Sequence, residues 1–130
     1  MVDFRYKGKT LEELKKMDVK EFLELVPSRV KRSLKRGFTE SQKLLLKKID
    51  STIEEKYKKP IKTHCRNMII IPKMVGLTIS IHKGNHFEMI KIQPESIGMR
   101  LGQLTLTRKK TEHSAPGVGA TKSSKAISTR

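Results

Sequence analysis

The chain has 130 residues, of which 29 are Lys or Arg and 13 are Asp or Glu, so its formal net charge is +16. Hydrophobic residues make up 35% of the chain, which allows one small domain with a thin core and argues against a deep substrate pocket. The excess of positive charge indicates a polyanionic partner, either nucleic acid or an anionic membrane.

Other classes of protein are disfavoured by what the sequence lacks. No apolar run reaches about 18 residues, the minimum for a membrane span, and the N-terminus has no apolar region typical of a secretory signal. The single cysteine, Cys65, excludes an intrachain disulfide framework and is typical of a reducing cytosolic setting. With no Trp, two Tyr and four Phe, RNA binding is expected to depend on charge and shape more than on base stacking.

Two short helices are predicted at the start of the chain. Thr10 and Glu13 form a capping box that begins the first helix. Asp18 begins the second in the same way, and Pro27 either ends it or starts the next element. Residues 1–26 hold six acids and six bases, so this neutral extension suits contact with protein better than contact with RNA.

The first basic segment follows directly. Residues 27–36 hold five bases and no acid, and Gly37 can act as a C-cap. The pattern fits either a turn of helix or a loop. Because a solvated surface would mix charges of both signs, we interpret this segment as a phosphate contact.

The strongest helix is predicted to begin at Thr39, which forms a capping box with Gln42, and to end at Lys59-Pro60. Four apolar residues recur at four-residue steps, so they predict a face buried in the core. These residues are Leu45, Ile49, Ile53 and Tyr57.

A small sheet is predicted after this helix. Residues 61–66 are compatible with a strand, whereas the apolar residues 67–72 fit either a strand or a helix. Residues 77–82 alternate and predict a second strand. Residues 83–85 predict a hairpin turn, and residues 86–92 the returning strand, in which a shift of the apolar pattern indicates a bulge.

The C-terminal part is expected to be a short helix over 93–102 with Gly102 as its C-cap, an extended basic exit over 103–110, and a disordered tail from Thr111. Residues 56–130 hold fifteen bases and three acids. The positive charge is therefore concentrated in residues 27–36 and in the C-terminal half, as a phosphate-binding surface requires.

Histidines are the candidates for catalysis or metal binding. His64 and Cys65 lack further ligands at zinc spacing, so no metal site is expected. His82 and His86 flank the predicted hairpin and could face each other, either as a hydrogen-bonded or phosphate-facing pair or, less favoured, as the acid and base of a ribonuclease. No catalytic residue and no cofactor is expected.

Two further binding functions fit less well. A helix-turn-helix DNA-binding protein would need a base-reading helix, yet the helix from Thr39 carries Glu40, Asp50, Glu54 and Glu55. Binding to a membrane surface would need a basic amphipathic helix with bulky aromatic residues. A basic nucleic-acid-binding protein that acts as a DNA or RNA architectural factor is the alternative function.

Five segments, in order and at compatible spacing, carry a family resemblance. They are Arg32-Ser33-Leu34-Lys35-Arg36-Gly37, Lys59-Pro60-Ile61-Lys62-Thr63, Ile71-Pro72-Lys73-Met74-Val75-Gly76-Leu77-Thr78-Ile79, His82-Lys83-Gly84-Asn85, and Ile97-Gly98-Met99-Arg100-Leu101-Gly102-Gln103-Leu104 with Thr107-Arg108. Together they closely resemble the ribosomal small-subunit protein family S-nineteen over residues 29–110, and the extension and tail resemble its archaeal–eukaryotic branch. Lys83 stands where many relatives carry Asn, and Gln103 where an acidic residue is common.

The resemblance implies an α+β fold, with an amphipathic helix packed on a small three-stranded sheet, an N-terminal helical extension and a disordered basic tail. It implies a helical extension over 1–28, an RNA-binding α+β domain over 29–110 and a flexible basic tail over 111–130. It also implies a non-enzymatic, cytoplasmic protein of the small-subunit head. Its expected partners are small-subunit ribosomal RNA, the thirteenth small-subunit protein and, through a tail that reaches toward the decoding site, transfer RNA; no membrane is expected.

Basic and turn residues are expected to contact RNA. They are Arg29, Lys31, Arg32, Ser33, Lys35, Arg36, Gly37, Lys59, Lys62, His64, Arg66, Lys73, Lys83, Gly84, Asn85, His86, Arg100, Arg108, Lys109 and Lys110.

Overall fold

The computed structural model describes residues 4–57 and 59–112, so the part of the predicted tail after residue 112 lies outside the described residues. The helices are α1 (Leu11–Lys16), α2 (Val19–Leu25), α3 (Ser28–Lys35), α4 (Glu40–Ile53) and α5 (Leu101–Leu104), with 3-10 turns η1 (Pro72–Met74) and η2 (Pro94–Ser96). The strands are β1 (Arg5–Tyr6), β2 (Lys9–Thr10), β3 (Ile61–Thr63), β4 (Thr78–His82) and β5 (Phe87–Lys91). The predicted α+β class is confirmed, and none of the described helices has the length and apolar character to span a membrane.

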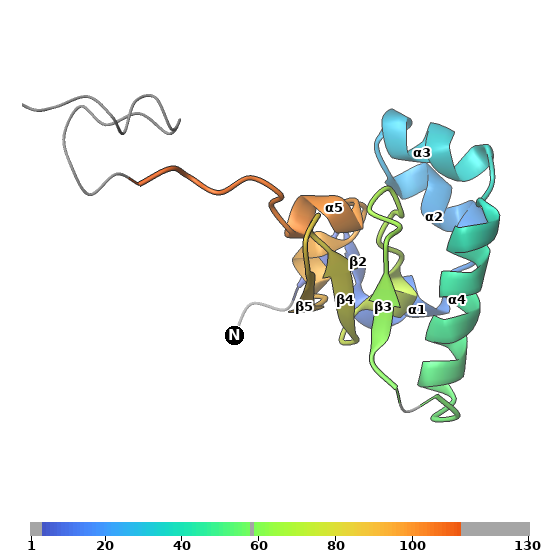
Figure 1. The fold of residues 1–130 in the computed structure, drawn as a ribbon. Helices are drawn as coiled ribbons and strands as arrows, with labels where there is room; N and C mark the ends of the chain where they lie inside the picture. Colours follow the sequence, from blue (N-terminus) through green and yellow to red (C-terminus); the bar gives the residue numbers. More distant parts are fainter. Residues whose placement is uncertain (1–3, 58, 113–130) are drawn as a thin grey trace, which may run out of the picture.

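The three-stranded sheet has the order β3-β4-β5, and α4 runs beside β3 (Figure 1). β3 pairs with β4 in parallel and β4 with β5 in antiparallel. The β4–β5 register is unbroken from Thr78 opposite Lys91 to His82 opposite Phe87, so the predicted bulge is wrong. The apolar pattern shifts because Met89 is a strand residue that is 72% exposed, not because a residue is inserted.

The two predicted N-terminal helices are confirmed. The Glu13 carboxylate accepts from the Thr10 N–H at 2.9 Å, and the Asp18 carboxylate accepts from the Val19 N–H. A hairpin of β1 and β2 precedes them, which the sequence analysis did not predict. Its turn places Lys7 and Gly8 at φ 51° and 84°, and glycine adopts that left-handed conformation at little cost.

The N-terminal extension shares the core of the rest of the molecule. Leu14 of α1 and Phe22 of α2 are 1% and 2% exposed, and they belong to the same buried cluster as Ile49 of α4 and the strand residues Ile79 and Ile81. α1 also packs against η1. The extension is therefore held by apolar burial, which makes it part of one folded unit.

Helix α4 begins as predicted but ends earlier. Gln42 closes the capping box with Thr39, and Leu45 and Ile49 are buried. The predicted end at Lys59-Pro60 is wrong, because the helix stops at Ile53, which is 51% exposed. Glu55 takes a left-handed φ of 58°, and this reversal turns the chain away from the helix axis.

The apolar segment after β3, which the sequence left open between strand and helix, has an extended conformation around Ile70. The Ile70 N–H donates to the Met99 carbonyl, and the Ile70 carbonyl accepts from the Gly98 N–H. These bonds hold residues 98–99 alongside 70, so the single helix predicted over 93–102 is wrong. The segment instead forms η2 and α5, separated by Gly98 at φ 81°.

Candidate nucleic-acid interface

The first basic segment is a helix, α3, and not a loop. Its N-cap is Pro27, and Leu34 is its buried residue. The predicted C-terminal glycine is confirmed, because Gly37 has φ 87° and its N–H donates to the Leu34 carbonyl at 3.1 Å. Anchoring through Leu34 leaves five basic side chains on the outside of the helix, called here the helix patch. They are Arg29, Lys31, Arg32, Lys35 and Arg36; Lys31 is half-buried and the others are exposed.

Arg100 extends the helix patch onto the start of α5. Its guanidinium lies 3.4 Å from the Ser33 hydroxyl, and Arg100 and Gln103 line a shallow hollow together with Arg29. The Gln103 amide oxygen accepts from the Arg100 N–H at 2.9 Å. Gln103 therefore retains the acceptor that an acidic residue would provide there, without adding negative charge to the patch.

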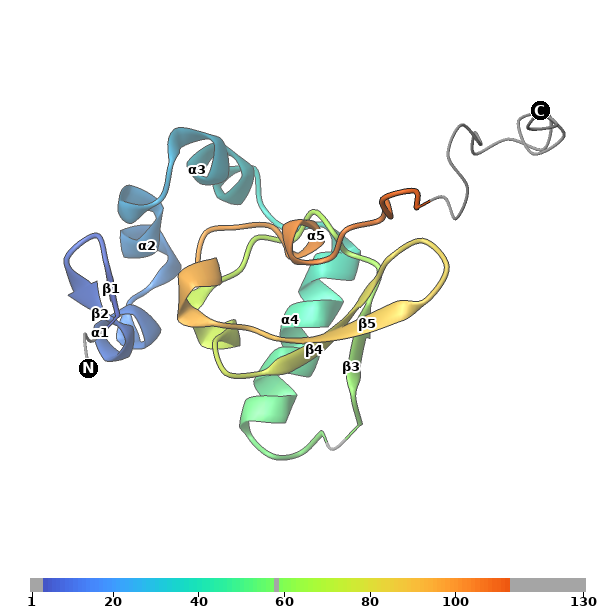
Figure 2. The same cartoon turned by 90° about the vertical axis from the view of Figure 1, so that its left-hand side faces the viewer.

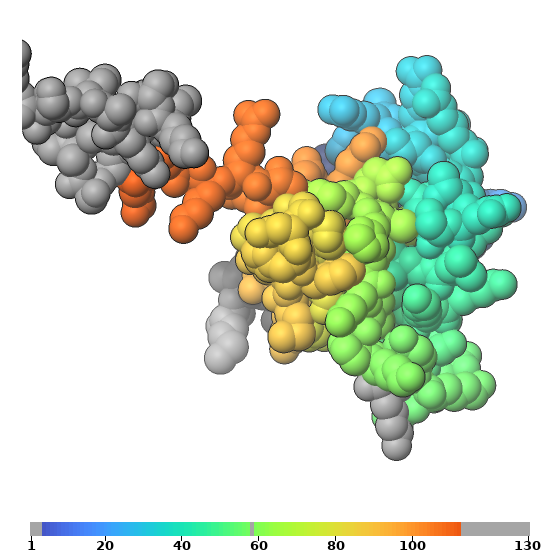
Figure 3. Space-filling model, in the orientation of Figure 1, coloured from blue at the N-terminus to red at the C-terminus, as the bar shows by residue number. Residues whose placement is uncertain are grey.

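A larger open groove, called here the basic groove, lies between the β4–β5 turn and the segment that leaves α5. It has a volume of about 920 Å³. Its walls bring together two sets of residues that were predicted separately, the turn residues and the basic exit. They are Lys83, Gly84, Asn85, His86, Glu88, Leu104, Leu106, Thr107, Arg108, Lys109 and Lys110. Figure 3 shows the segment after α5, in orange, projecting from the body of the molecule beside the yellow β5 region.

The electrostatics of the basic groove are dominated by cations. Glu88 contributes a carboxylate to its wall, and this group pairs with the Lys83 ammonium at 3.3 Å. Arg108, Lys109 and Lys110 are all exposed on the opposite wall. Since α5 contributes Gln103 to the hollow beside α3 and Leu104 to the basic groove, the two basic regions are neighbours, with α5 between them (Figure 2).

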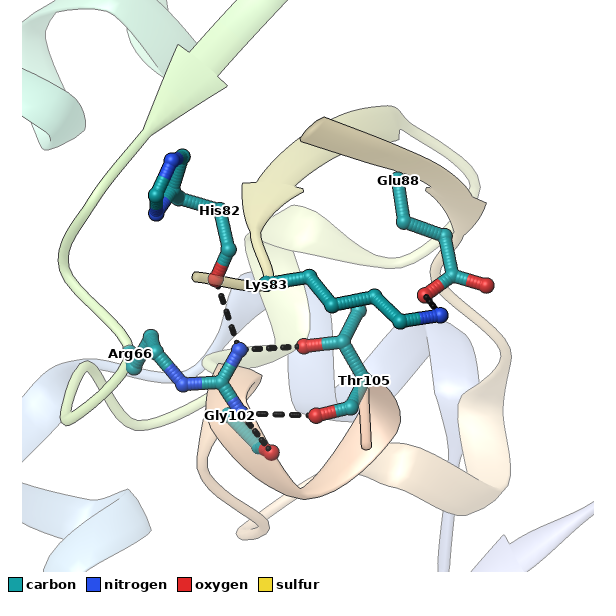
Figure 4. Close-up of polar contacts among 6 residues, drawn as sticks. All are labelled: Arg66, His82, Lys83, Glu88, Gly102 and Thr105. Carbon is teal, nitrogen blue, oxygen red and sulfur yellow. Dashed lines mark hydrogen bonds and ion pairs between the residues drawn. The ribbon is translucent and has the colours of Figure 1, made fainter. Parts of the chain in front are cut away.

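Arg66 has a different position from the one expected of an RNA contact. Its guanidinium donates to the carbonyls of His82 and Gly102 at 2.7 and 2.8 Å, and to both oxygens of Thr105 (Figure 4). Thr105 is 1% exposed. The donors of Arg66 are thus directed into the protein, where they join the end of β4 to α5.

Gly102 is required by this arrangement and is not a C-cap. It lies inside α5, and its N–H donates to the Arg66 carbonyl at 2.8 Å. A Cβ at this position would lie 3.0 Å from both the Cβ and the carbonyl oxygen of Arg66. Such contacts are closer than packed side chains tolerate, so glycine permits the approach of α5 to Arg66.

Histidines and one phenylalanine gather on the sheet. The rings of His64 and His82 have centroids 4.2 Å apart, and Phe87 packs edge-on against both at 5.1 and 4.9 Å. The prediction that His82 and His86 face each other is wrong, because the strand register places His82 opposite Phe87. His86 lies in the turn and lines the basic groove.

The pairing of His82 with Phe87 in this cluster was not predicted, since His82 was expected to face His86. Their pairing follows from the length of the hairpin turn, which sets the register of the two strands. His64 extends β3 on the same face, and that contact depends on the parallel pairing of β3 with β4, which no local pattern signals.

The remaining predicted RNA contacts lie at two separate places on the surface. Lys59 is exposed just before β3, and Lys62 is exposed within that strand. Lys73 lies on η1 and lines a hollow with Asp50 and Glu54, and this hollow shares no residue with the basic groove. Lys73 is therefore surrounded by mixed charge, which makes it the least favourably placed of the predicted phosphate contacts.

A comparison with known families matches the region that carries these features. The model of a family described as "Ribosomal protein S19" matches residues 32–113. The matched residues include the second half of α3, the whole three-stranded sheet, α5 and both walls of the basic groove. The N-terminal hairpin, α1 and α2 lie before the match.

Proposed function

Because this chain belongs to the ribosomal protein S19 family, we propose that it braces ribosomal RNA in the head of the small subunit through the helix patch and the basic groove. Membership makes the chain a small-subunit ribosomal protein that binds ribosomal RNA. The family is structural and not enzymatic, so the helix patch and the basic groove act by binding folded RNA.

The observation that carries this proposal is the convergence of two distant basic segments on one groove. Between residues 83–86 and residues 108–110 the chain forms β5, η2 and α5. The two segments nevertheless form opposite walls of the groove. Phosphate groups in such a groove would be neutralised from two sides, and release of their counterions would favour binding. Contacts of this kind fix the position and orientation of RNA without reading its sequence.

The predicted RNA contacts on these surfaces remain part of the proposal. The helix patch, Ser33, Gly37 and Arg100 form one part, and the basic groove forms the second. Lys62 on β3, with Lys59 before the strand and His64 after it, forms a third. Arg66 supports the proposal indirectly, since its hydrogen bonds position the exit segment.

The opposite part of the molecule suits contact with protein. α1 and α2 carry exposed charges of both signs, Glu12, Glu21 and Glu24 beside Lys15, Lys16 and Lys20. They therefore lack the excess of positive charge that favours phosphate binding. We place the neighbouring head proteins, the thirteenth small-subunit protein among them, on surfaces away from the basic groove. The net charge of +5 from Arg108 onward supports a C-terminal tail that reaches toward the decoding site and transfer RNA, in cytoplasmic ribosomes.

Sedimentation tests the function directly. The endogenous protein should travel with small subunits in a sucrose gradient at low salt, because many phosphate contacts act together. A pool that stays at the top of the gradient would contradict the proposal. Crosslinking of the purified subunits, followed by mass spectrometry, should then link this chain to head proteins; links confined to other regions would contradict the head location.

A further inference from the structure

Three aromatic side chains form a compact group on one face of the sheet. His64 follows β3, His82 ends β4 and Phe87 begins β5, so the three rings come from neighbouring ends of the three strands. The imidazoles of His64 and His82 are tilted by 33° with centroids 4.2 Å apart, and Phe87 stands edge-on to both, at 79° and 71°. We call this group the aromatic cluster.

The aromatic cluster lies on the face of the sheet opposite the core. Side chains alternate along a strand, and the buried residues Ile79 and Ile81 occupy the other face of β4. The ring of His82 points away from Arg66, while its carbonyl accepts from Arg66 (Figure 4). The cluster is therefore not needed to complete the core.

One ring of the aromatic cluster is accessible to a ligand. His64 is exposed, whereas His82 and Phe87 are half-buried. Since His82 covers one face of the His64 ring, the face turned away from His82 can receive another flat group. A planar base placed there would extend a stack that already contains two rings.

Positive charge surrounds the aromatic cluster. The Lys62 ammonium lies 5.6 Å from the centroid of the Phe87 ring. His82 and Phe87 directly adjoin Lys83 and His86, which line the basic groove. A polynucleotide whose phosphates lie in the groove would thus carry its next bases to the edge of the cluster.

From this arrangement we propose that the aromatic cluster stacks an unpaired base of RNA, with His64 as the outer stacking surface. The inference rests on the proposed function, because it requires RNA in the basic groove. Aromatic side chains on the open face of a small sheet bind single-stranded RNA by the same physics, and stacking of this kind tolerates any base. The ligand is consequently an unpaired loop, bulge or end, and not a continuous duplex.

Binding of two RNAs of equal length distinguishes base stacking from attraction by charge. One is a hairpin whose unpaired loop carries the fluorescent base 2-aminopurine, and the other is a blunt duplex. The full chain should quench the fluorescence of the loop, since a stacked base is quenched. His64→Ala should weaken loop binding about tenfold, the scale expected for loss of one stacked base, abolish the quenching and weaken duplex binding much less.

Two variants serve as controls. His64→Tyr should restore quenching, because it keeps an aromatic surface without an imidazole. His86→Ala removes a histidine that lines the groove outside the stack, so it should weaken loop and duplex binding by the same factor. Circular dichroism of each variant should match that of the unaltered chain.

The outcomes distinguish the inference from the proposed function. The stacking site is overturned, while RNA binding stands, if His64→Ala weakens binding of both RNAs equally or of neither. It is also overturned if the unaltered chain binds both RNAs without quenching the loop. If the unaltered chain binds neither RNA nor ribosomal subunits, the proposed function fails.

Discussion

The guanidinium of Arg66 donates to both the hydroxyl and the carbonyl of Thr105, at 2.7 and 2.6 Å. The two residues are 39 positions apart in the sequence. Through this pair, the loop after β3 fixes the point where the basic exit segment leaves α5. A charged residue that resembles an RNA contact in the sequence is thus a structural support for one wall of the basic groove.

Replacing Arg66 should destabilise the fold. Arg66→Ala removes four charge-assisted hydrogen bonds and leaves a buried threonine hydroxyl without its donor, so we expect a decrease of about 2–4 kcal/mol in the free energy of unfolding. Arg66→Lys should recover little of this lost stability, because an ammonium cannot reproduce the planar arrangement of donors. Urea denaturation measures the effect, with Lys48→Ala on the exposed side of α4 as control. Equal midpoints for the Arg66 and Lys48 variants would contradict the structural role.

The N-terminal extension should unfold together with the rest of the chain. Phe22 is 2% exposed in the common core, so Phe22→Ala should cost about 3–5 kcal/mol. Val19 lies on the same helix but is 37% exposed, and Val19→Ala should have a small effect. Calorimetry should show one transition, which moves to lower temperature in the Phe22 variant. Two separate transitions would show that the extension is an independent unit.

The basic groove should determine how RNA binding depends on salt. Lys83→Gln, Lys109→Gln and Lys110→Gln together remove three charges from its walls. The slope of the logarithm of affinity against the logarithm of salt should then fall by roughly 0.7–0.9 for each phosphate that the variant no longer neutralises.

A matched triple variant on α4 provides the control for this measurement. Lys43→Gln, Lys47→Gln and Lys48→Gln change the net charge by the same amount on an exposed helix outside the groove. Filter binding to a ribosomal RNA fragment at several salt concentrations compares the two. An equal change of slope in both variants would show that net charge, and not the groove, controls binding.

The capping box of α1 should respond to acid. The hydrogen bond from the Thr10 backbone N–H lowers the pKa of the Glu13 carboxyl from its ordinary value. Because the folded pKa lies below the unfolded one, the stabilisation is present above the unfolded pKa and is lost as the pH falls through the folded pKa. NMR titration of the Glu13 carboxyl should give a lower pKa in the folded chain than in urea. The same pKa in both states would exclude the hydrogen bond in solution.

Local patterns predicted much of the fold. The capping boxes at Thr10 and Thr39, the glycine after α3 and the strand of β4 are all fixed by residues within a few positions of one another. Such signals act through short-range hydrogen bonds and side-chain alternation. They survive in the folded chain because the tertiary contacts agree with them.

Predictions failed where distant segments decide the structure. The helix expected over 93–102 is interrupted because Ile70 occupies the hydrogen-bonding groups of residues 98 and 99. α4 ends early because the chain reverses at Glu55. The candidate site shows the same division: the basic segments were evident from composition, whereas the groove, the role of Arg66 and the aromatic cluster depend on contacts between segments far apart.

Crosslinking of the chain to RNA in purified small subunits, with the linked peptides identified by mass spectrometry, tests the central claim most directly. We predict ribosomal RNA adducts on α3, on residues 83–86 and on residues 108–110, and none on the surfaces of α1 and α2, which have no net positive charge. Adducts concentrated on α1 and α2, with none on the walls of the basic groove, would contradict the account.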